Sequence, residues 1–214
     1  MKIAIDILSD PICPWCYIGK TRLDQAMIER PDHPFEIRWR PFQLNPDMPA
    51  EGMDRRAYLE RKFGGPEGAA RVYGAIEQTA KDAGLQVRFD LIARTPNTID
   101  AHRLIRWADS MDAQTPVVED LFKRYFESGE DISDHGVLAE VAEIAGLDRA
   151  VIERLLATDT DSDAVREEDK TARGMGVSGV PTFIIDGRYV VPGAQDPELW
   201  VKTIDEITSA ASAT

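Results

Sequence analysis

The chain has 214 residues, of which 25 are Lys or Arg and 38 are Asp or Glu, so its formal net charge at pH 7 is −13 with histidine neutral. This acidic balance argues against nucleic acid as a partner, because contacts with phosphate come mainly from Lys and Arg. A hydrophobic share of 43% excludes general disorder, and a chain of this length buries enough surface to fold without disulfides or a metal ion.

We expect neither a membrane span nor a signal peptide. No stretch approaches the ~18 consecutive apolar residues of a span, and residues 1–7 alternate in polarity and contain an acid. We therefore expect a cytoplasmic protein with no membrane partner. The only cysteines, Cys13 and Cys16, exclude a secreted disulfide framework, and a close pair in a reducing compartment is typical of redox chemistry.

The first 42 residues read as a β-α-β unit. Alternating polarity over residues 3–8 predicts a strand with one buried face. Apolar residues at helical spacing predict a helix that opens at Pro14 and ends before Pro31. Alternation over residues 35–40 predicts a second strand, so the two cysteines lie at the first strand-to-helix junction.

Residues 43–174 are expected to form an all-helical insertion. Five apolar stripes at helical spacing support this, over residues 69–80, 101–108, 117–125, 138–145 and 151–156. The acidic segment 159–169 is weakly apolar, and we interpret its charge as solvated surface, either in a helix or outside one.

Strand character returns near the end of the chain. Residues 182–185 and 188–191 flank the turn signal Asp186-Gly187, which predicts a β-hairpin. A last helix is expected to open at Asp196 or Pro197. The pattern therefore predicts an α/β chain whose two terminal segments, residues 1–42 and 175–214, form one discontinuous domain.

The motif Cys13-Pro14-Trp15-Cys16 is the sharpest chemical signal. Cysteines three apart across the first turn of a helix can place their Cα atoms within the ~4.4–6.8 Å that a disulfide tolerates. Cys13 would sit where free backbone N–H groups favour a thiolate, and Cys16, one turn in, would be less exposed. This asymmetry assigns attack to Cys13 and resolution to Cys16. Trp15 adds an apolar surface for substrate contact and no charge.

Two other interpretations of the motif are weaker. A zinc site needs two further ligands, and the histidines, His33, His102 and His135, have no paired spacing; we expect no metal, and we interpret His102 as a hydrogen-bonded helix residue. A structural staple across so small a loop would gain little entropy and would not persist in a reducing compartment.

Several separated segments resemble one known family. The cysteine motif follows the first predicted strand, GVSGVPTF at residues 176–183 precedes the hairpin, and a helical block lies between them. This arrangement resembles the DsbA-like branch of the thioredoxin superfamily over essentially the whole chain. The segments SDPICPWCYIG (9–19), PFQL (41–44), NT (97–98) and AHRL (101–104) are most similar to FrnE-like proteins, which are related to 2-hydroxychromene-2-carboxylate isomerases and kappa-class glutathione transferases.

The resemblance implies a thioredoxin-like fold, with a βαβ unit, a β-hairpin and a C-terminal helix, interrupted by the insertion of residues 43–174. It also implies a cis peptide at Val180-Pro181 facing the cysteines, which would let Val180 offer its N–H and C=O to an extended substrate. The expected catalytic residues are Cys13, Cys16 and Pro181. The expected substrate-binding residues are Pro14, Trp15, Val180, Phe42 and Gln43.

We therefore expect a protein disulfide oxidoreductase or isomerase that exchanges disulfides with thiol- or disulfide-containing polypeptides. It would need no bound cofactor beyond a redox-active Cys13–Cys16 disulfide, with glutathione as a candidate co-substrate. Because Trp15 cannot stabilise a thiolate by charge, we expect a reduction potential less oxidising than that of periplasmic DsbA.

Two alternatives stay open. One is a glutathione-dependent isomerase or transferase in which Cys13 contacts the glutathione sulfur. The sequence departs from that branch at Cys13, where the branch usually has Ser, and at Gly193-Ala194-Gln195-Asp196, where it typically has a Ser-Asp pair. The other is a redox-independent chaperone whose activity would survive loss of both cysteines. The oligomeric state and the substrate are not predicted.

Overall fold

A four-stranded sheet forms the centre of the molecule in the computed structural model, which describes residues 2–212. The strands follow the order β2-β1-β5-β6. β1 pairs in parallel with β2, whereas β5 and β6 join as antiparallel strands. Their bounds are β1 (Ile3–Ser9), β2 (Phe35–Pro41), β5 (Thr182–Ile185) and β6 (Tyr189–Pro192). All four predicted strands are confirmed.

The β5–β6 connection is the tight turn that the sequence indicates. Asp186 and Gly187 both have positive φ, at 52° and 64°. Two successive residues with positive φ match the hairpin turn whose twist suits antiparallel strands. The turn therefore fixes the register in which Phe183 pairs with Val191.

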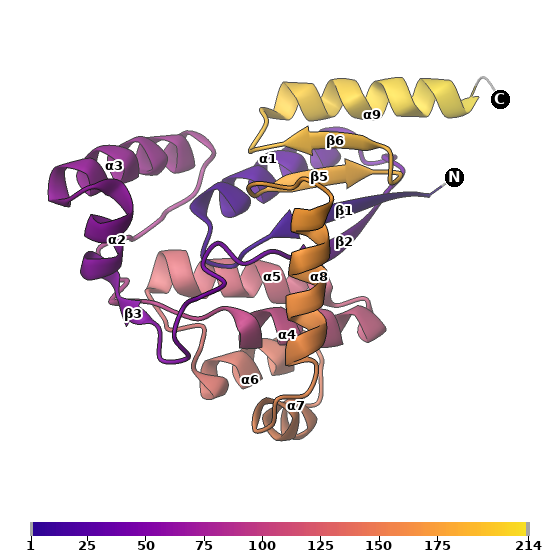
Figure 1. The fold of residues 1–214 in the computed structure, drawn as a ribbon. Helices are drawn as coiled ribbons and strands as arrows, with labels where there is room; N and C mark the ends of the chain where they lie inside the picture. The colour runs from indigo at the N-terminus through magenta and orange to yellow at the C-terminus, as the bar shows by residue number, and fades with distance from the viewer. Residues whose placement is uncertain (1, 213–214) are drawn as a thin grey trace.

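Two helices from opposite ends of the chain pack together on this sheet. α1 (Pro14–Glu29) follows β1, and α9 (Pro197–Ser212) lies above the hairpin in Figure 1. Trp200 of α9 is fully buried and packs edge-on against Phe183 of β5, with ring centroids 4.7 Å apart. The predicted first and last helices are thus confirmed, and the fold is the thioredoxin-like DsbA fold.

The long central segment is mostly helical. Most of its helices lie below the sheet in Figure 1, whereas its first two lie at the left, the second of them in contact with α1. Its helices are α2 (Arg55–Phe63), α3 (Pro66–Asp82), α4 (Ile99–Ala108), α5 (Gln114–Lys123), α6 (His135–Ile144), α7 (Arg149–Leu156) and α8 (Ser162–Gly174), with a 3₁₀ turn at Asp109–Met111 and a π-helical turn at Arg124–Ser128. None of the helices within residues 2–212 is both long and apolar enough to cross a membrane.

The expectation of an all-helical insertion needs one correction. Two short strands, β3 (Met53–Asp54) and β4 (Arg94–Thr95), form a separate antiparallel pair. Two residues are too few to show a period in the sequence, which is why the pattern did not reveal them. The acidic segment contributes to α8, where Val165 and Asp169 are buried.

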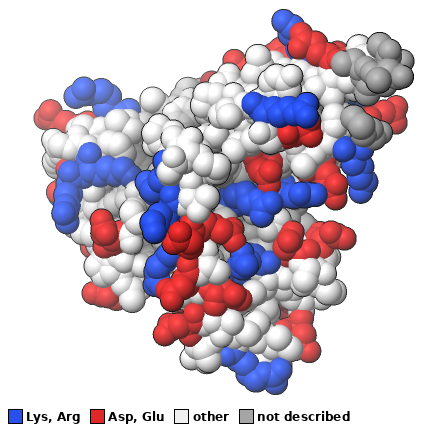
Figure 2. All heavy atoms as spheres, turned by 45° about the vertical axis from the view of Figure 1, so that its right-hand side comes forward, with Lys and Arg blue, Asp and Glu red and all other residues white. Residues whose placement is uncertain are grey.

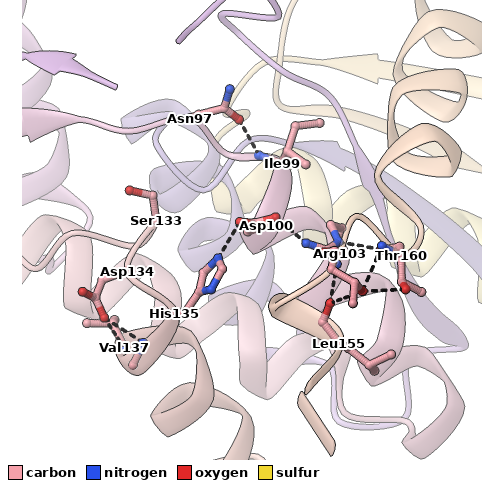
Figure 3. Close-up of polar contacts among 12 residues, drawn as sticks. Asn97, Ile99, Asp100, Arg103, Ser133, Asp134, His135, Val137, Leu155 and Thr160 are labelled. Carbon is pink, nitrogen blue, oxygen red and sulfur yellow. Dashed lines mark hydrogen bonds and ion pairs between the residues drawn. The ribbon is translucent and has the colours of Figure 1, made fainter. Parts of the chain in front are cut away.

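A buried arginine ties α4 to the connection between α7 and α8 (Figure 3). Arg103 donates to the carbonyl oxygens of Leu155 at 2.7 Å and of Thr158 and Thr160 at 2.6 Å each. Its guanidinium also pairs with Asp100 at 2.6 Å. The Thr158 and Thr160 carbonyls lie outside the helices, so the arginine supplies them with a donor. The Leu155 carbonyl, at the end of α7, also accepts from Thr158 N. Arg103 therefore ties α4 to this connection.

The ends of α4 and α6 are held by side chains visible in Figure 3. Asn97 Oδ1 accepts from the Ile99 N–H at 3.0 Å at the start of α4. His135 is the first residue of α6, and its Nε2 lies 2.9 Å from Asp100 Oδ2. The two helices are therefore joined at their N-terminal ends.

Candidate active site

The cysteine motif forms the first turn of α1. Cys13 is the N-cap residue with extended backbone, and Pro14 takes the first helical position. The Cys13 N–H donates to the Asp10 carbonyl at 2.9 Å, and the Cys13 carbonyl accepts from Cys16 N at 3.0 Å. The motif is thus held by backbone hydrogen bonds on both sides, and Cys13 lies at the positive end of the helix dipole.

The two cysteines differ in their surroundings. Cys13 and Cys16 are 3% and 1% exposed, and both are free thiols. Burial, together with the neighbouring Cys13, raises the pKa of the Cys16 thiol well above its ordinary value, while the Ser9 hydroxyl acts against this rise. Trp15 lies between them and is 38% exposed. Cys16 is therefore kept protonated, and the tryptophan presents a surface beside the sulfurs.

A loop from the far end of the chain faces the first cysteine. The Val180–Pro181 peptide bond is cis. The Cys13 Sγ–H donates to the Val180 carbonyl at 3.6 Å, across 167 residues of sequence. This contact brings together Cys13, Val180 and Pro181.

Gly19 allows α1 to approach this loop closely. A Cβ atom built on Gly19 would lie 2.9 Å from Pro181 Cγ and 3.4 Å from Ala194. The Pro181 carbonyl accepts from Gly193 N at 2.8 Å. The position of Pro181 opposite the cysteines therefore depends on the missing side chain at residue 19.

A buried acid lies behind the motif. Asp10 is 0% exposed, and its Oδ2 accepts from Leu44 N at 2.7 Å. Burial raises the pKa of Asp10 to about 7, although hydrogen bonds from Leu44, Ile12 and Thr98 favour the ionised form. At neutral pH this carboxyl is thus poised between its two protonation states.

A buried histidine on α4 faces this acid. His102 Nε2 lies 3.9 Å from Asp10 Oδ1 and makes no hydrogen bond with any described residue. Burial lowers the pKa of His102 to about 4, against the opposing influence of Asp169 and of a hydrogen bond with the Phe42 backbone. The structure thus brings His102, expected only as a hydrogen-bonded helix histidine, to the rear of the cysteine motif.

Two residues expected to line the substrate groove are buried instead. Phe42 is buried beneath the guanidinium of Arg173, whose central carbon lies 4.1 Å from the centroid of the Phe42 ring. Gln43 donates from its backbone N–H to Asp169 at 2.8 Å, and its side chain is also buried. Neither side chain forms part of an open surface here, because α8 covers both.

Asp10 is the functional candidate that the sequence pattern did not single out. Its only signal was a carboxylate directly after an apolar strand and before Pro11. Such a residue usually ends a strand at the surface, and burial of the carboxyl depends on α4 and the loop at Leu44, which come from distant parts of the chain.

Possible ligand groups elsewhere near the motif are already engaged. Arg22 of α1 donates to the Ala194 carbonyl at 2.7 Å. It also pairs at 3.0 Å with Asp196, the residue before α9. Gln195 donates to the Pro192 carbonyl at 2.6 Å. Within residues 2–212, no three His, Cys, Asp or Glu side chains group together as a metal site.

Comparisons with known proteins agree on the fold. A family model described as a DSBA-like thioredoxin domain matches residues 4–205. The uncharacterized protein YwbO of Bacillus subtilis (strain 168) is 29% identical over 207 residues, covering 96% of this chain and 98% of YwbO. The crystal structure of the probable DsbA oxidoreductase SCO1869 from Streptomyces coelicolor is 29% identical, with a TM-score of 0.84 over 95% of this chain and 89% of that one.

A more distant structure shares the fold alone. The cytosolic disulfide reductase DsbM from Pseudomonas aeruginosa is 18% identical, with a TM-score of 0.70 over 97% of this chain and 99% of that one. A second structure of DsbM, determined with GSH, is also similar, at 17% identity and a TM-score of 0.61 over 96% and 99% of the two chains.

Proposed function

This chain belongs to the family of DSBA-like thioredoxin domains, and we propose that it is a thiol–disulfide oxidoreductase that works through Cys13 and Cys16. The observation that carries the proposal is the 3.6 Å contact between Cys13 Sγ and the Val180 carbonyl. It places the first sulfur against backbone that an extended substrate can reach. The buried second sulfur, one helical turn further on, suits the resolving step.

The reaction conserves atoms and electrons as follows. The Cys13 thiolate attacks one sulfur of a substrate disulfide, which forms a mixed disulfide and releases the other substrate sulfur as a thiolate. Cys16 then loses its proton and attacks Cys13 Sγ, which releases the second substrate sulfur. Two electrons pass to the substrate, and a Cys13–Cys16 disulfide remains. In the oxidative direction the same steps run in reverse.

The surroundings of the motif suit a polypeptide substrate. Val180 would bind substrate main chain through its backbone groups, with Pro181 shaping that loop. Trp15 is exposed beside the sulfurs and would contact substrate side chains, whereas Pro14 is buried and would act by shaping the turn. Phe42 and Gln43 would act only through the packing of the Leu44 segment.

We further propose a cytosolic location and glutathione as the reducing partner. The support is fold-level similarity to DsbM, whose structures are described as those of a cytosolic disulfide reductase, one of them with GSH. No cofactor is required, because the electrons come from another thiol.

Two cysteine variants test the proposal. Cys13→Ser should abolish insulin reduction, because no attacking sulfur remains. Cys16→Ser should accumulate mixed disulfides, which non-reducing electrophoresis and mass spectrometry detect and which dithiothreitol dissolves. The matched control is Ser110→Ala, which removes an exposed hydroxyl on the turn after α4 and leaves both sulfurs and their neighbours unchanged. Equal insulin reduction by wild type and both cysteine variants would refute the assigned roles.

The two alternative functions are distinguishable by the same proteins. A glutathione-dependent isomerase would bind reduced glutathione saturably without being oxidised, yet Arg22 and Asp196 at the start of α9 are already paired with each other. A redox-independent chaperone would suppress aggregation equally well in the double variant Cys13→Ser/Cys16→Ser.

A further inference from the structure

A cavity lies away from the cysteines, between α2, α3 and the segment before β4. Its volume is about 590 Å³, within the range of small-molecule sites. Neither cysteine lines it. The walls are mainly apolar, formed by Leu59, Pro66, Ala69, Ala70, Tyr73, Phe89, Ile92 and Ala93.

One buried cation lines this cavity. Arg55 opens α2 and is 5% exposed. Its Nη1 donates to the Tyr125 hydroxyl at 3.0 Å, and its guanidinium carbon lies 5.0 Å from the Tyr73 ring centroid. Its Nη2 is buried and has no hydrogen-bond partner among residues 2–212. The charge is therefore surrounded by neutral aromatic groups.

Arg55 also lacks a counter-charge. Within the described part of the chain it makes no ion pair, and the carboxylates that line the cavity have other partners. Asp54 accepts from Ala57 N at 2.9 Å as the cap of α2, Glu60 pairs with Arg56 at 2.7 Å, and Asp90 pairs with Arg88 at 2.7 Å. Buried charges in proteins are normally paired, because desolvation without a partner is costly.

The surrounding surface favours an anion. α2 carries four basic residues and one acidic residue, in a chain whose net charge is −13. On the face shown in Figure 2, basic and acidic side chains both lie at the left, the side on which Figure 1 places α2 and α3. The excess of basic residues on α2 itself attracts negatively charged ligands toward this helix.

We propose that this cavity binds a small organic carboxylate with an apolar tail. The carboxylate pairs with the Arg55 guanidinium and supplies the missing counter-charge, while the tail lies along the apolar walls. The site is separate from the cysteine motif, so it stands whether or not the proposed redox function holds.

Isothermal titration calorimetry with octanoate tests the proposal on the full chain. Wild type should bind octanoate saturably with 1:1 stoichiometry, and octan-1-ol, which has the same tail without the charge, should bind at least about tenfold more weakly. Arg55→Met should weaken octanoate binding by about tenfold or more. The matched control is Arg61→Met, which removes the same charge from an exposed position on α2 that does not line the cavity and should change the affinity less than about twofold.

A second variant keeps the test decisive if Arg55→Met does not fold. Ala70→Phe fills the cavity and leaves Arg55 in place, so it should abolish octanoate binding while the far-UV circular dichroism stays that of wild type. Absence of saturable binding to wild type at millimolar octanoate, or undiminished binding to folded Ala70→Phe, overturns the proposal. Loss of binding in Arg61→Met but not in Arg55→Met does so as well.

Discussion

Asp10 and His102 should give opposite pH dependence to the stability of the protein. Burial raises the pKa of Asp10 from 3.8 to about 7, so the folded state binds more protons than the unfolded state between these values. This contribution to stability is complete below pH 3.8 and is lost as the pH rises through 7. Burial lowers the pKa of His102 from 6.5 to about 4. Its contribution is complete above pH 6.5 and is lost as the pH falls through 4.

The two effects overlap and nearly cancel between pH 5.5 and 7.5. Linkage applied to these pKa values gives a loss of about 2 kcal/mol from Asp10 over that interval and a gain of about 1 kcal/mol from His102. Neither figure is reduced for solvent screening, because both side chains are buried. The pair should therefore contribute little net pH dependence to the wild-type protein.

Removing one partner exposes the effect of the other. We expect the stability of Asp10→Asn relative to wild type to rise by about 2 kcal/mol from pH 5.5 to 7.5, and that of His102→Gln to fall by about 1 kcal/mol. Urea denaturation in excess reductant, at half-unit pH steps, measures both. The double variant is the control, and its difference from wild type should change by less than about 1 kcal/mol. Differences that stay constant with pH, or that change with the same sign, would refute the reasoning.

Three further outcomes are expected. Equilibration with glutathione buffers should give a potential more negative than about −120 mV, since Trp15 supplies no charge to stabilise a thiolate; a value that high would be contrary to this. Gly19→Ala should destabilise the folded protein by about 1–3 kcal/mol in thermal unfolding, because the new Cβ would lie 2.9 Å from Pro181. Gly74→Ala has open space around its Cβ and should stabilise the folded protein by about 0.5–1 kcal/mol. Equal effects of the two variants would refute the packing argument. Arg103→Leu should cost about 3 kcal/mol or more in urea denaturation, because the Thr158 and Thr160 carbonyls lose their donor and Asp100 loses one of its two partners; a cost below about 1 kcal/mol would contradict that role.

The parts of the fold that the sequence predicts are those with a regular residue pattern. Alternating polarity predicts β1 and β2, and strand character around the turn signal Asp186-Gly187 predicts the hairpin. The pairing of β3 with β4 had no such signal, because each strand is two residues long.

The candidate site divides in the same way. The cysteine motif is local, so its position at a strand-to-helix junction follows from residues 3–16 alone. The buried pair of Asp10 and His102 could not be predicted from neighbouring residues, because each side chain is buried only when β1 packs against α4. A titratable residue in a sequence is ordinarily expected to be exposed, but tertiary packing buries both of these side chains.

The position of β1 between β2 and β5 has a consequence for biosynthesis. Its first neighbour, β2, is complete at residue 41, but its second neighbour, β5, begins only at residue 182. While the chain is still emerging from the ribosome, β1 is an edge strand, and Cys13 and Cys16 are made long before the loop that faces them. The newly made chain thus carries two cysteines without the loop that faces them until residues 180–185 have been made and β5 has paired with β1.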